Sequence, residues 1–221
     1  MQHIMIDLEM NKIHRQVRED YKLSSELIEI GAVRMNTHFD LLDKFQTYVY
    51  PVYGKMDARI IELTGIRDYM LEGAPKYHEA MDLFAKWVGP EESVFYSWSM
   101  SDLRQFQAES AFKGYHGPLM KRMEAHWIDF QEEYGRLLGI SKAIKLKQAV
   151  NSADYEFTGD EHTALADAVN TAEILRLSRN PEEFERVMKP VLDLFRPETE
   201  ATTLKDMCPE FFEAWNKLPK E

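Results

Sequence analysis

"IDLEM", residues 6–10, places two acids at the end of the first apolar stretch of the chain. Residues 4–6 predict the start of a buried strand, and Asp7 and Glu9 follow with one residue between them. Side chains alternate between the two faces of a strand, so Asp7 and Glu9 are expected on the same face. Acids are common at strand ends, so this pair indicates a function only if further chemistry-bearing residues gather near it.

Length and composition predict a globular chain. The 221 residues, 44% of them hydrophobic, can form one core, or one domain with a helical extension. No run of eighteen apolar residues occurs, so we expect no membrane-spanning segment. The first strand starts at about residue 3, which leaves no room for a signal peptide. Cys208 is the only cysteine, so no intramolecular disulfide can form, and we expect a reducing, cytoplasmic setting.

The net charge of −11 limits the kinds of nucleic-acid binding that are plausible. Proteins that coat long duplexes draw most of their affinity from a basic surface, and this chain is acidic. An enzyme that grips only a few terminal nucleotides remains compatible with the charge.

The hydrophobic periodicity changes along the chain from a strand pattern to a helix pattern. Three consecutive strands are expected first, at residues 3–9, 24–36 and 41–51, with a polar turn at 36–40 between the last two. Two shorter strands are expected at 93–99 and 126–130, and helices at 58–66, 77–89, 101–114, 131–139, 141–150 and 161–180. This order predicts an α/β domain over residues 1–180 with a mixed sheet, followed by a C-terminal helical extension, 181–221, packed on it.

Two further acids are plausible neighbours of the first pair. In layered α/β folds, ligand sites lie at the carboxyl ends of strands, where Asp7 and Glu9 are expected. Asp102 follows the fourth expected strand and opens a helix; taken alone, it is better explained as an N-cap or first-turn acid that favours the helix dipole. Asp167 lies among small apolar residues of the longest expected helix, which favours a role in a site over an exposed polar stripe, the alternative that the pattern leaves open.

His162 precedes Asp167 by five residues. On a regular helix they would point about 140° apart, so they cannot share one face. Both can reach one site only if His162 lies at the helix entrance, where the backbone is less constrained. Gly159 and Asp160, typical loop and cap residues, support that placement.

Together these segments resemble the DEDDh exonucleases of the DnaQ-like family. The family's Asp-x-Glu motif matches Asp7 and Glu9, its second motif matches Asp102, and its H-x-A-x-x-D motif matches "HTALAD", residues 162–167. The resemblance covers about residues 3–178. The combination of "LTGI" (63–66) with "HTALADAVNTA" (162–172) looks most like the branch that contains the histone-mRNA 3′ exonuclease and the sporulation protein KapD.

The resemblance implies a ribonuclease H-like mixed five-stranded sheet flanked by helices. It also implies 3′–5′ exonuclease activity on RNA or single-stranded DNA ends, with release of nucleoside 5′-monophosphates. Two Mg²⁺ or Mn²⁺ ions would be held by Asp7, Glu9, Asp102 and Asp167, because hard oxygen ligands suit these cations. His162 would be the general base.

The resemblance also implies contacts with the terminal nucleotide from Met10, Leu63 and Thr64, although ordinary packing explains these residues equally well. Many relatives have Thr at the position of Met10, and relatives in the named branch often have Trp where this chain has Ser101. Trp98 lies three residues before Ser101.

Lys142, Lys145 and Lys147 form the densest basic run of the chain. They are expected either to follow a phosphate backbone or to form a solvated helix face. Two alternative functions are a non-catalytic nucleic-acid-binding module on the same fold and an exonuclease subunit of a larger assembly. The sequence alone does not identify protein partners or choose between RNA and DNA.

Overall fold

A five-stranded mixed sheet forms the centre of the computed structural model, which describes residues 1–13 and 23–195. Its strands are β1 (Gln2–Lys12), β2 (Ser25–Met35), β3 (Leu41–Tyr48), β4 (Ser93–Ser97) and β5 (Trp127–Asp129), in the spatial order β3-β2-β1-β4-β5. The pairs β1–β2 and β2–β3 are antiparallel, whereas β1–β4 and β4–β5 are parallel. The predicted α/β fold class with a mixed five-stranded sheet is therefore confirmed.

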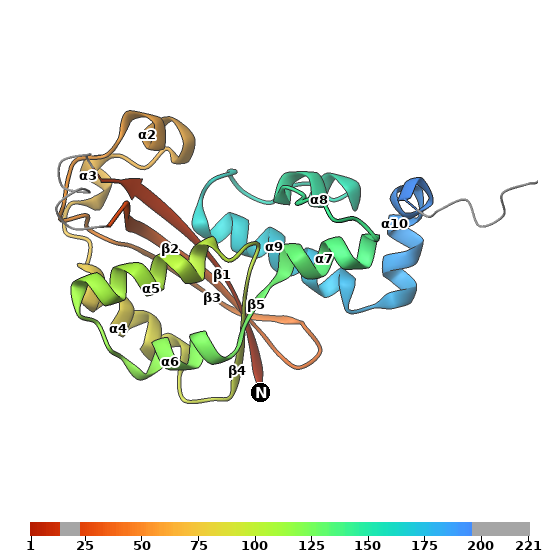
Figure 1. The fold of residues 1–221 in the computed structure, drawn as a ribbon, viewed down its shortest axis with the longest axis horizontal. Coiled ribbons are helices and arrows are strands. Elements are labelled where there is room, and N and C mark those ends of the chain that lie inside the picture. Colours follow the sequence, from red (N-terminus) through yellow and green to blue (C-terminus); the bar gives the residue numbers. More distant parts are fainter. Residues whose placement is uncertain (14–22, 196–221) are drawn as a thin grey trace, which may run out of the picture.

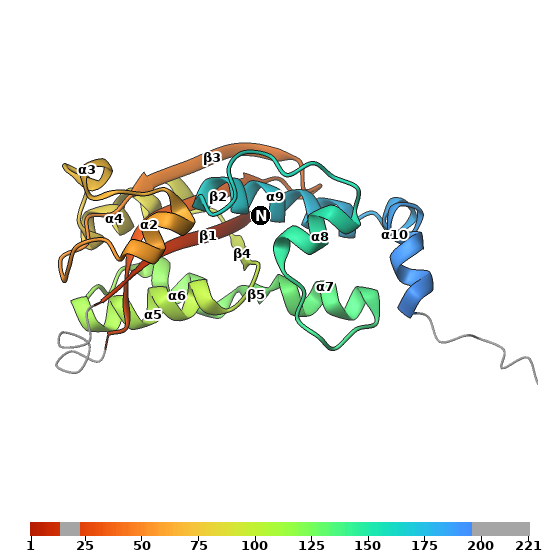
Figure 2. The same ribbon diagram turned by 90° about the horizontal axis from the view of Figure 1, so that it is seen from above.

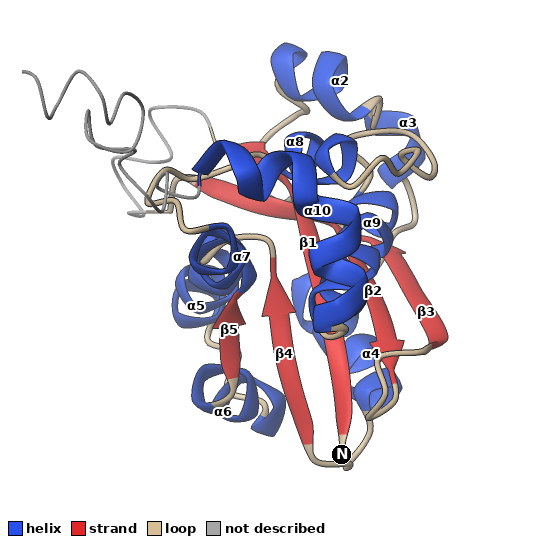
Figure 3. Ribbon diagram, turned by 90° about the vertical axis from the view of Figure 1, so that its right-hand side faces the viewer, coloured by secondary structure: helices blue, strands red, loops and turns tan. Residues whose placement is uncertain are grey.

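Helices cover both faces of this sheet (Figures 1, 2 and 3). They are α2 (Ala58–Thr64), α3 (Asp68–Leu71), α4 (Tyr77–Val88), α5 (Ser101–Lys113), α6 (Pro118–Ala125), α7 (Phe130–Leu138), α8 (Leu146–Ser152), α9 (Ala164–Ser178) and α10 (Pro181–Phe195). Figure 1 shows α4, α5 and α6 on one side of the sheet and α7 to α10 on the other. The short helices α2 and α3 lie near the carboxyl end of β1.

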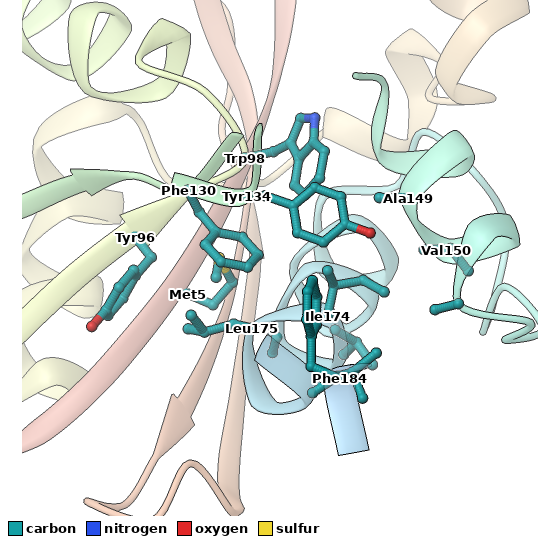
Figure 4. Close-up of a cluster of buried hydrophobic side chains, with 14 of the residues drawn as sticks. Met5, Tyr96, Trp98, Phe130, Tyr134, Ala149, Val150, Ile174, Leu175 and Phe184 are labelled. Atoms are coloured by element: carbon teal, nitrogen blue, oxygen red, sulfur yellow. The ribbon is translucent and has the colours of Figure 1, made fainter. Parts of the chain in front are cut away.

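The alternation of side chains along β1 divides the core in two. Ile4, Ile6 and Leu8 point to the face covered by α4, α5 and α6, where they join one buried cluster. Met5 points to the opposite face and packs in a second cluster with residues of α7, α9 and α10, part of which Figure 4 shows. Asp7 is two residues beyond Met5, so it faces the α9 side of the sheet.

Several element boundaries differ from the sequence-based expectation. Strand β3 ends at Tyr48, before Pro51, and α8 begins at Leu146 instead of residue 141. The segment before α8 is held in a non-helical path partly by Trp98 and Gln131, whose side chains both donate to the carbonyl of Ile144. These contacts are distant in sequence, and local periodicity does not report them.

Helices α3 and α6 were not predicted. Helix α3 has only four residues, which is too short for a periodic pattern to be visible. Helix α6 begins with Pro118 directly after Gly117, a start signal that the sequence does contain.

Helix α10 covers the first part of the expected C-terminal extension. Phe184, Met188 and Leu192 are buried in the cluster that also contains Tyr134 of α7. The domain boundary at residue 180 stays a prediction. Residues 196–221, with Cys208, lie outside the described residues. Within the described residues, we find no helix that is both long enough and apolar enough to span a membrane.

Candidate active site

The site begins where β1 continues past its neighbour β4. Strand β4 pairs with β1 only from Gln2 to Met5, so the edge of β1 beyond Met5 has no strand beside it on that side. The backbone N–H of Leu8 instead donates to the Asp102 carboxylate over 3.1 Å. Asp7 and Glu9 flank this bond, which brings Asp102 beside them.

Asp102 lies in the first turn of α5 and is 3% exposed. The residue at the N-cap position is Met100, which makes no side-chain cap bond, so Asp102 is not the N-cap; it is the first-turn acid that the sequence also allowed. Its second oxygen accepts the hydroxyl of Ser101 over 3.1 Å. Asp102 therefore ties α5 to β1 while its charge faces the acids of β1.

Asp167 and His162 reach the site from the start of α9. Helix α9 begins at Ala164, so His162 lies just before it, in a left-handed conformation with φ 63°. This conformation is uncommon for non-glycine residues and costs on the order of 1–3 kcal/mol. It turns the histidine out of the helical path. Oxygens of Glu9 and Asp167 and a ring nitrogen of His162 consequently lie within 4.8 Å of one another.

The five residues that the motifs single out thus come together at the junction of β1, α5 and α9. Their charges oppose each other. Burial raises the pKa of Asp7 well above its ordinary value, and the negative charges of Asp102, Asp167 and Glu9 raise it further. Burial, with the charge of Asp167 next in size, raises the pKa of Glu9 to about 9.

The other two acids show smaller shifts in the same direction. Burial raises the pKa of Asp102 to about 7, although hydrogen bonds from Ser101 and Leu8 act against that rise. Burial also raises the pKa of Asp167 to about 6, while the charge and backbone N–H of His162 lower it. Simultaneous deprotonation of all four carboxyl groups is therefore unfavourable unless additional positive charge is present.

A divalent cation fits this set of donors. Glu9, Asp167 and His162 form the one group of three or more acidic, histidine or cysteine ligands found close enough to share an ion within residues 1–13 and 23–195. Carboxylate oxygens are the ligands that Mg²⁺ and Mn²⁺ prefer, and a bound cation would neutralise the mutual repulsion of the acids.

A fifth acid, Glu29 of β2, was missed in the sequence. It lies directly opposite Glu9 in the β1–β2 pairing and is 1% exposed. Its charge contributes to the raised pKa of both Asp7 and Glu9. The signal was present in "LIEIGA" (27–32), where an acid interrupts an apolar strand. The sequence does not show that β2 is an internal strand or that α9 packs against the face of β2 on which Glu29 lies, and both facts are needed to place this acid at the site.

The three residues expected to contact a terminal nucleotide have different environments in the structure. Met10 packs against the core on the α5 side. The Thr64 hydroxyl donates to the carbonyl of Ile60 and accepts the backbone N–H of Ile66, so it serves the end of α2. Leu63 is 48% exposed, and its apolar surface remains free to meet a base. The substrate-binding role of all three stays a prediction.

The basic run is not one helix face. Lys142 and Lys145 precede α8 and are exposed, whereas Lys147 lies inside α8 and pairs with Glu161 over 2.6 Å. Trp98 is buried against Phe130 and Tyr134, as Figure 4 shows, so its ring contributes to the core.

The mixed sheet of order β3-β2-β1-β4-β5, with helices on both faces, is a ribonuclease H-like fold. A family model described as Exonuclease, the RNase T family, matches residues 4–175. The chain belongs to this exonuclease family, and the resemblance to DEDDh exonucleases is confirmed.

Relatives in this family include proteins named for DNA and for RNA. DNA polymerase III subunit epsilon of Aquifex aeolicus is 31% identical over 152 residues, which cover 68% of this chain and 70% of that protein. ERI1 exoribonuclease 2 of Danio rerio is 27% identical over 187 residues, covering 70% of this chain. The chain matches only 31% of the length of the zebrafish protein.

Solved structures share the fold. The nuclease domain of 3′hExo, a DEDDh family member bound to rAMP, superposes with a TM-score of 0.67 and 23% identity, covering 80% of this chain and 92% of that one. Exonuclease I of E. coli, in complex with a dT13 oligonucleotide, gives a TM-score of 0.66 at 12% identity, covering 84% and 43%.

Mg²⁺ is expected to stabilise the protein more strongly as the pH rises. Acids of raised pKa keep their protons in the folded state, whereas the same acids in the unfolded chain lose theirs above about pH 4. The stability of the metal-free protein therefore falls as the pH increases toward the folded pKa values, up to about 9 for Glu9. A cation that binds only the folded state opposes this loss. The measurement is the melting temperature at pH 5, 7 and 9, with and without Mg²⁺.

The matched control for this experiment is Asp167→Ala. Taking the difference with and without Mg²⁺ at each pH cancels the titration of acids elsewhere. The Mg²⁺-induced gain should shrink in the variant. Equal gains in both proteins would mean that the ions bind outside the acid cluster.

Proposed function

We propose that this protein is a 3′–5′ exonuclease that hydrolyses RNA or single-stranded nucleic acid from its 3′ end and releases nucleoside 5′-monophosphates. The observation that carries the proposal is the meeting of Asp7, Glu9, Asp102 and Asp167 with His162 at the junction of β1, α5 and α9. Family membership supports the reaction class.

The acids are proposed to hold two Mg²⁺ or Mn²⁺ ions. Asp7 is central because its pKa responds to Asp102, Asp167 and Glu9, which suits a carboxylate shared by both ions. Glu9 and Asp167 would complete one ion site, and Asp102 would act on the second chiefly through water. Two such ions supply charge neutralisation for the attacking and leaving oxygens of a phosphoryl displacement.

His162 is proposed to take the proton from the attacking water. It is exposed at the site rim, where substrate and water can reach it. Its ring lies close to Glu9 and Asp167, so the proton would be accepted beside the ion-binding acids. A positioned general base contributes about 10²–10⁴-fold to a rate.

Digestion of matched 5′-labelled RNA and DNA oligonucleotides with Mg²⁺ or Mn²⁺ tests the proposed function. We expect products that shorten stepwise from the 3′ end, nucleoside 5′-monophosphates as the released species, and no digestion with a chelator. RNA should be cut at least as readily as single-stranded DNA, since the segments "LTGI" (63–66) and "HTALADAVNTA" (162–172) resemble those of an RNA-degrading branch. A strong preference for DNA would contradict this choice of substrate, and no digestion of either would contradict the proposed function.

Two expectations from the sequence remain predictions. A role as the nuclease subunit of a larger assembly predicts that size-exclusion chromatography from a native extract shows the chain in a larger complex. A cytoplasmic setting rests only on the single cysteine and on the absence of an apolar run in the sequence.

A further inference from the structure

Helix α9 lacks a local cap for its first N–H groups. The first four N–H groups of a helix have no partner within the helix and are usually satisfied by a neighbouring side chain. The N-cap residue here is Thr163, and it makes no side-chain cap bond; its hydroxyl donates instead to the carbonyl of Asp160. The helix start that carries His162 and Asp167 therefore depends on another acceptor.

Glu29 supplies that acceptor from the sheet. The backbone N–H of Ala164 donates to Glu29 Oε2 over 3.1 Å, although the two residues are 135 positions apart in the sequence. The other oxygen, Oε1, accepts from the Gln46 amide of β3 over 2.5 Å. Both oxygens of the carboxylate are thus engaged, and a negative charge at a helix N-terminus is favourable.

Gly31 lets α9 come close enough for this bond. A Cβ atom at Gly31 would lie 2.1 Å from the carbonyl carbon of Ala164 and 2.2 Å from the backbone nitrogen of Leu165. Backbone atoms cannot yield at such distances. Glu29 and Gly31 point to the same face of β2, so the strand provides both the contact surface and the hydrogen-bond acceptor for one helix turn.

The position of that turn sets the geometry of the site. Ala164 lies two residues after His162 and three before Asp167, and Glu29 lies opposite Glu9 in the sheet. We propose that Glu29 is a positioning residue that caps α9 from β2 and thereby fixes Asp167 and His162 against Glu9. This inference rests on the proposed function, since it assigns Glu29 to the same site without placing it among the ion ligands.

The test compares Glu29→Ala with Glu29→Gln. Alanine removes the acceptor, whereas the glutamine amide keeps an oxygen for the Ala164 N–H and can donate its NH₂ to a flipped Gln46. We expect Glu29→Ala to weaken Mg²⁺ affinity and lower kcat by about 10–100-fold, as is typical when a residue that orients a metal ligand is lost. Glu29→Gln should restore both to within about threefold of the parent, because the hydrogen bond is retained.

Glu26→Ala is the matched control for a purely structural effect. Glu26 is also a fully buried acid of β2, but it accepts the backbone N–H groups of Val52 and Tyr53 and pairs with Lys113, away from α9. Its loss should lower the melting temperature without changing kcat or Mg²⁺ affinity below that temperature. If Glu29→Ala behaves in the same way, Glu29 is only structural and the proposal is wrong.

Amide hydrogen exchange in the absence of substrate separates this inference from the proposed nuclease function. Residues 162–168 should lose protection in Glu29→Ala and keep it in Glu29→Gln, even if the parent digests no nucleic acid. Gly31→Ala, which changes no charge, should also loosen this segment and weaken Mg²⁺ binding by displacing α9. A glutamine variant as defective as the alanine variant would assign Glu29 a role through its charge and overturn the positioning proposal.

Discussion

Asp7→Asn is expected to lower nuclease turnover by at least about 10³-fold, on the order of the losses seen when one member of a catalytic group is removed. Asp7 is the acid whose pKa is raised by all the other members of the cluster, so it lies at their electrostatic centre. Asparagine keeps the shape of the side chain but removes the charge that two cations would share. The measurement is kcat on labelled RNA with saturating Mg²⁺.

The same substitution should not harm the fold. Removing one of several mutually repelling charges relieves repulsion, so the melting temperature of the metal-free protein should stay equal or rise. The stabilisation by Mg²⁺ should become small. Asp43→Asn, at an exposed position of β3, is the control and should retain activity. A well-folded Asp7→Asn protein with full activity would rule out the two-ion assignment.

His162→Ala is expected to lower turnover by about 10²–10⁴-fold, the usual contribution of a general base. The side chain is exposed, and the strain of the left-handed backbone is present with either histidine or alanine at position 162. Little change in stability is therefore expected. Turnover is measured at saturating Mg²⁺ so that any change in ion affinity does not lower the rate.

Ion binding must be measured alongside, because a ring nitrogen of His162 lies close enough to Glu9 and Asp167 to be a ligand itself. A base predicts that the Mg²⁺-induced rise in melting temperature survives in His162→Ala while turnover falls. Loss of both would make the histidine an ion ligand or a structural support. His116→Ala, at an exposed histidine just after α5, is the matched control and should behave as the parent.

The sequence was sufficient to predict the five strands, most of the helices and the five motif residues of the site. The period-two pattern of residues 3–9 placed Asp7 and Glu9 on one face, and β1 keeps that alternation as far as Glu9, where the pairing with β2 shifts. The angular argument for His162 predicted a residue at the helix entrance, and α9 does begin two residues later. These predictions worked because they depend on local geometry, which is the same in every strand or helix.

Tertiary structure decided how these residues meet. Asp102 serves the site because β4 ends early and leaves the N–H of Leu8 open, a fact about strand pairing that no local pattern reports. In the sequence, Glu29 is only one polar residue within an apolar strand. Its place beside the site follows from the internal position of β2 and from the hydrogen bond to α9. Sequence alone thus determined the chemistry available to this protein and the face on which Asp7 and Glu9 lie. The packing of α5 and α9 against the sheet determined which acids share one site. The hydrogen bonds and the electrostatic repulsion that act there join residues far apart in the chain, so no local sequence pattern reports them.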